Sequence, residues 1–404
     1  MVRGPEGPVF VPFVLPGERV VLGAVTRRGK ALAASAEVVE ASAERVAPPC
    51  RHFGDCGGCR LQHWRDEPYR TWKRGRVVAA LRRAGFADAP VADLVAGAPG
   101  TRRRLDLAAR RERGGVVLGL HAAREGRVVD LGECAIAVPE LVSLLQPLRE
   151  LLAGLGGFRR EADVHLNLLD TGADVLIRAE GEVSVPDRAR LAEFARAFGV
   201  PRVAWAVRRR APDIAIQLSR PSVAFGGVAV TPPPGTFLQA SREAEGAIVA
   251  AVLAALPAKG AVLDLFAGVG TISLPMANGR AVTAVEGDAG ACAALDAASR
   301  VAGRHVRVVR RDLARQPMAG AELRGFAAAV LDPPYAGARE QVAALAEAGV
   351  ARVVMVSCNP DALARDAGLL REAGYGCEGA VPIDAFLWSA DVETVAVFTR
   401  KPLR

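Results

Sequence analysis

The regular alternation of strand-like and helix-like segments in the last part of the chain constrains its fold more than any other feature. Apolar β-forming runs recur from residue 261 onward, and segments with helical periodicity separate them. A chain that alternates in this way builds a mostly parallel sheet with helices on both faces. We therefore predict an α/β, doubly wound, Rossmann-like sheet for residues 231–404. The expected strands are residues 261–266, 281–286, 306–310, 327–331, 352–357 and 394–400, with another near 381, and the expected helices are residues 272–278, 290–302, 341–348 and 361–373.

The earlier residues predict three further units. Residues 1–47 alternate β-formers with turn residues, which is typical of a small OB-like barrel, a fold that often binds single-stranded nucleic acid. Residues 48–97 contain a Cys- and Gly-rich loop and then a basic helix. Residues 98–230 mix strand-like runs with helical patterns at residues 139–155 and 187–198, which indicates an α+β central domain. The turn-rich residues 231–235 mark its boundary with the last unit.

Basic residues are concentrated in the first third of the chain. The net charge is +8, and residues 1–130 contain 23 Lys and Arg against 14 Asp and Glu. Because basic surfaces bind polyanions through phosphate contacts, this distribution favours RNA as a partner, although a merely solvated surface would look the same. No export signal or membrane-length apolar run is evident, so we expect a cytoplasmic protein that does not bind membranes. We also expect a monomer.

A glycine turn follows the first expected strand of the last unit. The motif Asp-Leu-Phe-Ala-Gly-Val-Gly at residues 264–270 lets the backbone approach a ligand closely at Gly268. It lacks the third glycine of a pyrophosphate site, which favours S-adenosylmethionine over NAD. Glu286 ends the next strand, where it can bind ribose hydroxyls, and Asp312 can contact the adenine end. Asp332 opens Asp-Pro-Pro-Tyr, where a target base would meet the methyl group.

Cys358 lies just past the end of an apolar strand, on the same edge of the expected sheet. Asn359 and Pro360 break the strand at once, so we expect the thiol to face the ligand rather than a packed layer. Addition of a thiolate to C6 of a uracil makes C5 nucleophilic enough to accept a methyl group. A base must then remove the C5 proton, and Glu393 is the candidate.

Four other cysteines suggest a metal site. Cys50, Cys56 and Cys59 lie within ten residues, and Cys134 can supply a fourth ligand from a distance. Four thiolates suit either an iron–sulfur cluster or zinc. Only one Cys-x2-Cys pair is present, which favours the cluster. Because the proposed methyl transfer requires no electron, we expect the cluster to have a structural role.

These features together resemble the uracil-C5 RNA methyltransferase family, in its iron–sulfur-containing branch, which modifies bacterial rRNA and tRNA. The resemblance spans nearly the whole chain and includes a shortened TRAM-like barrel. The motifs that carry it are Cys-x5-Cys-Gly-Gly-Cys at 50–59, Thr-Phe-Leu-Gln at 236–239, Asp-Leu-Phe-Ala-Gly-Val-Gly at 264–270, Asp-Pro-Pro at 332–334, Ser-Cys-Asn-Pro at 357–360 and Val-Glu-Thr-Val at 392–395.

The resemblance implies a class I S-adenosylmethionine-dependent enzyme. It implies a [4Fe-4S] cluster on the four cysteines, with Cys358 as nucleophile and Glu393 as proton acceptor. It favours 23S rRNA over tRNA as substrate, because the tRNA-specific members lack the barrel and the cluster. The implied cofactor contacts are Gln239, Phe266, Thr271, Glu286, Asp312 and Asp332, to which the glycine turn adds Gly268.

Two residues of the expected pocket depart from the family pattern. Tyr335 follows Asp-Pro-Pro where members carry Arg, and Asp391 stands where members commonly carry His. Asp-Pro-Pro-Tyr also resembles the motif of enzymes that methylate exocyclic amines, which would leave Cys358 idle. An RNA cytosine-C5 enzyme would use a cysteine too, but usually one within the Asp-Pro motif, where this chain has none. A non-enzymatic interpretation is an RNA-binding redox sensor with a degenerate methyltransferase fold.

Overall fold

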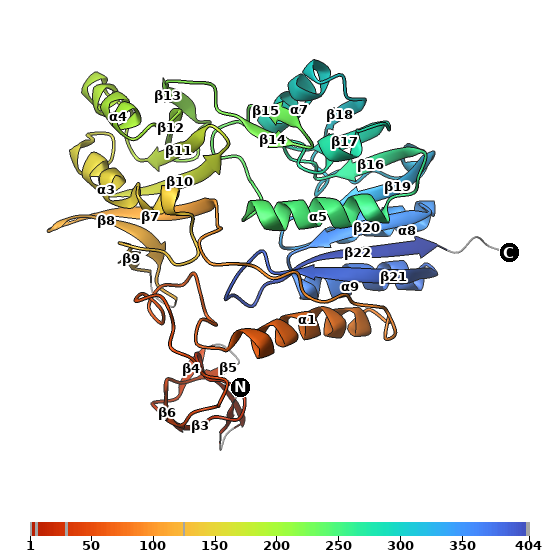
Figure 1. Ribbon diagram of the computed structural model, residues 1–404, viewed down its shortest axis with the longest axis horizontal. Helices are drawn as coiled ribbons and strands as arrows, with labels where there is room; N and C mark the ends of the chain where they lie inside the picture. Colours follow the sequence, from red (N-terminus) through yellow and green to blue (C-terminus); the bar gives the residue numbers. More distant parts are fainter. Residues whose placement is uncertain (1, 5–6, 29–30, 124–125, 401–404) are drawn as a thin grey trace.

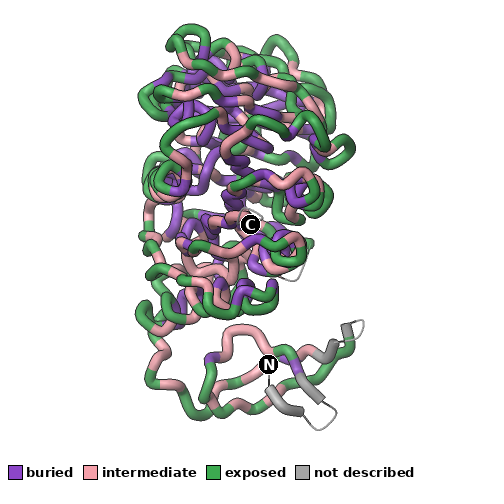
Figure 2. Tube along the Cα trace, turned by 90° about the vertical axis from the view of Figure 1, so that its right-hand side faces the viewer, coloured by how far each residue is buried: buried purple, intermediate pink, exposed green. Residues whose placement is uncertain are grey.

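The computed structural model describes residues 2–4, 7–28, 31–123 and 126–400. Figure 1 shows a small N-terminal β unit, a central sheet and a larger C-terminal sheet, with helix α1 (Asp66–Arg83) lying beneath the C-terminal sheet. Figure 2 shows that buried residues concentrate in the two sheet units and are sparse in the N-terminal unit. The hydrophobic cores that fix the active-site geometry therefore belong to the two sheets.

The N-terminal unit is built from short strands. A four-stranded sheet has the order β1-β2-β5-β4, and β3 pairs with β6. Its described apolar core is small, with Leu15 and Ala34 buried, and an ion pair supplements it: Arg45 Nε lies 2.5 Å from Glu18 Oε1. This hydrogen bond lowers the pKa of Glu18 to about 2. The strands are β1 (Val2–Gly4), β2 (Gly7–Phe10), β3 (Arg19–Leu22), β4 (Thr26–Arg28), β5 (Ala31–Ala33) and β6 (Ala36–Glu40).

The central unit is a seven-stranded sheet covered by helices on one face. Its strand order is β13-β12-β11-β10-β7-β8-β9. Helix α4 begins at a capping box in which Ser184 and Asp187 each accept a hydrogen bond from the other's backbone. The strands are β7 (Arg104–Glu112), β8 (Gly115–His121), β9 (Val128–Asp130), β10 (Glu161–Leu169), β11 (Gly172–Ala179), β12 (Arg202–Val207) and β13 (Asp213–Gln217), and the helices are α2 (Pro139–Val142), α3 (Leu145–Gly154) and α4 (Val185–Ala197).

The C-terminal unit confirms the predicted α/β fold. Its strand order is β18-β17-β16-β19-β20-β22-β21, with helices on both faces. The sheet is parallel except for β22, which runs antiparallel to both of its neighbours. The strands are β16 (Ala261–Leu265), β17 (Val282–Glu286), β18 (Val306–Arg310), β19 (Phe326–Leu331), β20 (Arg352–Ser357), β21 (Tyr375–Ile383) and β22 (Glu393–Arg400), and the helices are α5 (Arg242–Ala255), α6 (Ser273–Met276), α7 (Ala289–Val301), η1 (Gly320–Leu323), α8 (Arg339–Ala348) and α9 (Pro360–Glu372).

Segments outside residues 231–404 also pack on this unit. The hairpin of β14 (Val223–Phe225) and β15 (Val228–Val230) buries its apolar side chains in one cluster with those around α7. Helix α1 packs against α9, and residues 91 and 95 pair with β21. The chain before residue 231 thus supports the C-terminal sheet directly, while the four proposed domain limits stay predictions.

Candidate active site and cysteine loop

The glycine turn after β16 has the backbone conformation that its sequence predicts. Phe266, Gly268 and Gly270 have φ values of 63°, 54° and 98°. A side chain at Gly270 would collide with Leu274 and Leu295, so glycine is required there for packing. At Gly268 an added Cβ would meet no atom within 4 Å, so the space in front of this turn is open to a ligand.

Glu286, at the end of β17, holds the glycine turn in place. Its Oε2 accepts a hydrogen bond from the Gly268 backbone N–H at 2.9 Å, and its Oε1 accepts one from Asp288 at 2.8 Å. Asp312 is exposed beyond β18. A Cβ added at Gly287 would lie 3.6 Å from the Cα of Asp312, so the two residues are close neighbours. Thr271 follows the turn and is half-buried. The predicted ribose and adenine contacts therefore share one edge of the sheet.

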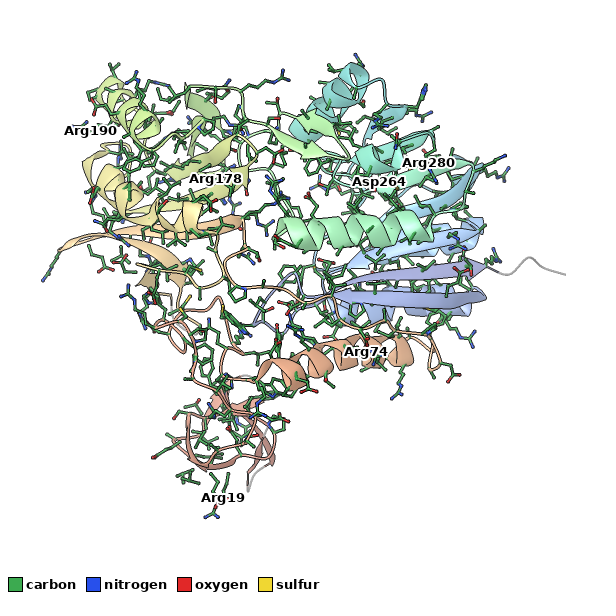
Figure 3. All side chains as sticks on the ribbon, in the orientation of Figure 1. Arg19, Arg74, Arg178, Arg190, Asp264 and Arg280 are labelled. Carbon is green, nitrogen blue, oxygen red and sulfur yellow. The ribbon has the colours of Figure 1, made fainter. Side chains whose placement is uncertain are left out.

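Asp264, inside β16, is a buried acid that we did not select from the sequence. Its Oδ2 accepts a hydrogen bond from the Ser273 hydroxyl, while its Oδ1 has no partner among the described residues. Burial raises its pKa to about 7. Figure 3 places it within the C-terminal sheet. An acid in the middle of an otherwise apolar strand is the signal that would have identified it.

Gln239 lies near the start of the C-terminal unit, and its side chain contacts the residue that follows β19. Its Nε2 donates to Asp332 Oδ2 at 2.9 Å, and its backbone carbonyl accepts from the buried guanidinium of Arg103 at 3.2 Å. Burial raises the pKa of Asp332 to about 7, although the bond from Gln239 opposes this shift.

Cys358 and Glu393 are brought together by the antiparallel pairing of β20 with β22. Ser357 pairs with Thr394, so the residue after β20 lies beside the first residue of β22. Burial raises the pKa of the Cys358 thiol to about 12, and the nearby Glu393 and Asp332 add to this effect. Burial, and then Asp332, raise the pKa of Glu393, whose Oε1 has no partner within the described chain. A thiol and two acids thus lie near one another at this edge of the sheet.

Tyr335 and Asp391 lie beside these groups and contact each other. The Tyr335 hydroxyl is 3.3 Å from Asp391 Oδ1, and the Tyr335 carbonyl accepts from Asn359 Nδ2 at 3.0 Å. Tyr335 is 59% exposed, so its ring is available to an incoming ligand.

The loop that leads to Glu393 is fixed by helix α1. Lys73 is fully buried against Asp384 and also donates to the Phe386 carbonyl at 2.8 Å. The Tyr69 hydroxyl donates to Asp384 Oδ2 at 2.8 Å and accepts from the Trp388 backbone at 2.8 Å. The sequence predicted a basic helix in this region, but Lys73 of this helix is buried inside the protein and pairs with Asp384.

The loop at residues 50–62, called here the cysteine loop, brings four thiols close together. The electrostatic environment of Cys59 includes Cys134, Cys56 and Cys50, and all four are free thiols, with Cys59 buried. Arg51 lies 3.6 Å from Glu133, which ties this loop to the segment that carries Cys134.

Two neighbouring contacts fix the cysteine loop further. The Gly57 backbone donates to the His121 carbonyl at 3.0 Å. The backbones of Arg60 and Leu61 donate to the Trp388 carbonyl at 2.8 and 3.0 Å, so this loop touches the segment that precedes Glu393. Within the described ranges, no group of three or more His, Cys, Asp or Glu side chains is placed so that it could hold a metal ion.

The described residues include no helix that is both long and apolar enough to cross a membrane.

The structure gathers Gln239, Phe266, Gly268, Glu286, Asp332, Cys358 and Glu393 at the carboxyl edge of the parallel strands, with Thr271 and Asp312 on the same side. Their individual roles remain predictions.

Comparisons with known proteins agree on one family. The chain is 45% identical over 402 residues to an uncharacterized RNA methyltransferase of Brucella suis, covering 98% of this chain and 94% of that protein. It is 37% identical to the 23S rRNA (uracil(1939)-C(5))-methyltransferase RlmD of Halomonas elongata, covering 96% and 84% of the two chains. No family model matches the sequence.

The fold has a close counterpart among solved structures. The structure of Pyrococcus abyssi tRNA (uracil-54, C5)-methyltransferase in complex with S-adenosyl-L-homocysteine matches with a TM-score of 0.75 at 23% identity. The match covers 97% of this chain and 95% of that one, so the fold is shared across all units.

Proposed function

Because this chain belongs to the uracil-C5 RNA methyltransferase family, we propose that it transfers a methyl group from S-adenosylmethionine to C5 of a uridine in 23S rRNA. One observation carries the chemistry: a half-buried thiol, Cys358, lies beside a buried acid, Glu393, at the sheet edge that also holds Asp332. Covalent addition to a pyrimidine needs this combination of a nucleophile and a proton acceptor.

The fit of the methyl donor rests on the glycine turn and the acids around it. Gly268 fronts open space, Glu286 orients the turn, and Asp264 Oδ1 is buried without a partner in the described chain. When bound, S-adenosylmethionine would supply an electrophilic methyl group. Gln239, Phe266, Thr271, Glu286, Asp312 and Asp332 would hold it.

In the proposed reaction, Cys358 loses its thiol proton and its sulfur adds to C6 of the uracil. The new bond places negative charge on the C4 oxygen and C5, and C5 takes the methyl group. Glu393 then removes the C5 proton, the C5–C6 double bond re-forms, and the thiolate leaves. Burial raises the pKa of this thiol to about 12, so the reaction includes loss of its proton before or during the addition to C6.

Methylation of an exocyclic amine is the second candidate. The observation that favours it is the exposed ring of Tyr335 after Asp-Pro-Pro, which is placed where a base can stack. In that reaction Cys358 would form no bond to RNA. The two candidates therefore differ in whether a covalent intermediate exists.

The choice of rRNA over tRNA rests on sequence similarity to the 23S rRNA enzyme over 96% of this chain. The test is to map 5-methyluridine across total RNA from a strain that lacks this protein. We expect one 23S rRNA uridine to lose its methyl group and to regain it on complementation. Loss at a tRNA position instead, or no change in 5-methyluridine, would contradict the proposal.

We also propose that Cys50, Cys56, Cys59 and Cys134 hold a [4Fe-4S] cluster. All four are free thiols of one neighbourhood, joined by the contact of Arg51 with Glu133. A cluster binds each thiolate through a different iron, so its ligands need not converge on one ion, in contrast to a zinc site. The Gly57 and Leu61 contacts support a structural role for the cysteine loop, which lies between the central unit and the segment before Glu393.

A further inference from the structure

The central sheet has an open face that begins next to the active site. Helices α3 and α4 cover the other face, on the side away from the C-terminal unit (Figure 1). On the open face Asn167 donates to the Thr236 carbonyl at 2.8 Å, and Leu176 packs against Gly235. Residues 235 and 236 precede Gln239 by only a few positions. One end of this face therefore adjoins the pocket that contains Asp332.

The far end of the same face is an arginine-lined hollow. It is lined by residues of β7, β10 and β11 and by the turn after β12, called here the arginine turn (residues 208–210). Along β10, Glu161 at the hollow and Asn167 at the pocket end are about six residues apart, which is about 20 Å. A bound strand can reach from one end to the other. The basic residues of the hollow are Arg110, His121, Arg178, Arg208 and Arg209.

Hydrogen bonds hold the arginine turn in a defined conformation. Arg208 has a φ of 51°, a left-handed conformation that costs free energy in any residue except glycine. Its backbone N–H donates to the Ala179 carbonyl at 2.8 Å. The guanidinium of Arg178 donates to the carbonyls of Arg208 and Arg210 at 3.3 and 3.1 Å. Arg178 thus fixes the conformation of the turn that carries Arg208 and Arg209.

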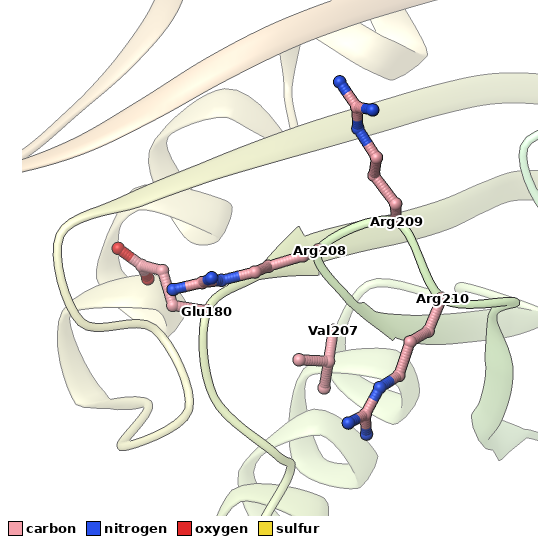
Figure 4. Close-up of a pocket in the computed structure, with 5 residues that line it drawn as sticks. All are labelled: Glu180, Val207, Arg208, Arg209 and Arg210. Atoms are coloured by element: carbon pink, nitrogen blue, oxygen red, sulfur yellow. The ribbon is translucent and has the colours of Figure 1, made fainter.

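The three arginine side chains of this turn differ in whether they form an ion pair. Arg210 pairs with Glu182 at 2.8 Å, but neither Arg208 nor Arg209 forms an ion pair with any residue in the described part of the chain. Both are exposed; in Figure 4 the Arg208 side chain extends toward Glu180, and the Arg209 side chain extends in a different direction.

Most acids nearby are occupied, although Asp163 also lines the hollow and is exposed. Glu180 accepts hydrogen bonds from the backbones of residues 159–161, Glu161 lies 3.3 Å from Arg110, and Asp106 lies 2.8 Å from His165. Two arginines without acidic partners, held by a strained turn, suit a phosphate better than a carboxylate of the same chain.

We propose that Arg208 and Arg209 bind the sugar–phosphate backbone of the substrate RNA at the far end of the open face of the central sheet, which extends about 20 Å along β10 from the end beside the active site. This inference rests on the proposed function, because it takes RNA as the ligand of the active site. It adds a contact outside the basic N-terminal third, in which the sequence suggested the RNA-binding surface.

The test is the double variant Arg208→Gln and Arg209→Gln. Binding to unmodified 23S rRNA transcribed in vitro should weaken roughly tenfold, and the slope of log affinity against log salt should become shallower by about 1.4 to 1.8. The KM for this RNA should rise by a similar factor while kcat at saturating RNA and the methylated position stay unchanged. The matched control is Arg190→Gln with Arg196→Gln on α4, which covers the opposite face (Figure 3) and should leave binding unchanged.

The variant Arg208→Gly separates binding from folding. Glycine accepts a φ of 51° without strain, so this variant should melt at the same or a higher temperature yet bind RNA more weakly. The proposal is overturned if the double variant binds RNA as the α4 control does, or if only kcat falls. If the wild-type enzyme methylates no uridine but the double variant still loses RNA affinity, the proposed function fails and the RNA contact stands.

Discussion

The hydroxyl of Tyr335 lies 3.3 Å from Asp391 Oδ1, so the two positions that depart from the family pattern contact each other. Asp391, and with a smaller effect Cys358, raise the pKa of the Tyr335 phenol, which places this pair at the edge of the nucleophile's pocket. The two departures therefore form one local replacement: a phenol donor and a carboxylate acceptor stand where members carry Arg and commonly His.

We expect Tyr335→Phe and Asp391→Asn each to lower kcat about two- to fivefold, because either change weakens a hydrogen bond worth about 1 kcal/mol. The double variant should be no worse than the more damaging single one, since both remove the same contact. Single-turnover methylation of 23S rRNA measures this. Strictly additive losses would show that the two residues act independently.

The buried pair of Lys73 and Asp384 should position the loop before Glu393. Lys73→Met leaves a buried carboxylate without its cation, which should cost about 3–5 kcal/mol of folding free energy. The remaining folded enzyme should also show a lower kcat, because the Phe386 carbonyl loses its donor. The matched control is Arg202→Met, which breaks the buried pair with Asp174 in the central sheet. It should destabilise comparably and leave kcat unchanged, whereas equal kcat losses in both variants would refute a positioning role.

Reactivity of the Cys358 thiol should follow its raised pKa. Burial raises that pKa to about 12, so the reactive thiolate is scarce at pH 7 and increases about tenfold with each pH unit until the pKa is approached. Alkylation by iodoacetamide, followed by mass spectrometry of the peptide containing Cys358, should show this rise between pH 7 and pH 10 in RNA-free enzyme. A plateau near pH 8 would mean that the thiol is already ionised in the empty pocket.

Anaerobically purified protein should be brown and contain about four irons per chain. Cys59→Ser should lose colour and iron, and backbone hydrogen exchange at Arg60 and Leu61 should increase because their bonds to the Trp388 carbonyl depend on the cysteine loop. Cys377→Ser is the control, since Cys377 lies in β21 away from this loop. A colourless protein with one zinc would contradict the cluster.

The sequence predicted the C-terminal sheet well because alternation of strands and helices is a local signal. It predicted that Cys358 lies just past the end of a strand at the cofactor edge, and it named Glu393 as the candidate base. It did not predict that β22 is antiparallel, which is what places Glu393 beside Cys358. Strand direction depends on how the connecting loop turns, and this loop is held by Tyr69 and Lys73, more than 300 residues earlier.

Other differences have local causes. The helix expected at residues 139–155 is divided into α2 and α3, and the one expected at 272–278 shortens to Ser273–Met276. Helix α5 and the β14–β15 hairpin were not expected. The hairpin has few residues to show a period, and it gains its stability by burying Val223 and Phe225 against the C-terminal unit.

The most direct measurement of the central claim uses 23S rRNA transcribed with 5-fluorouridine, whose C5 fluorine cannot be removed as a proton. Incubation with the enzyme and S-adenosylmethionine should give a protein–RNA adduct that survives denaturation and maps by mass spectrometry to Cys358, and Cys358→Ala should form none. A Glu393→Gln variant should accumulate a similar adduct on ordinary RNA, because the C5 proton then lacks its acceptor. If no adduct forms on the fluorinated RNA, or if Cys358→Ala methylates RNA at near the wild-type rate, covalent catalysis by Cys358 is wrong.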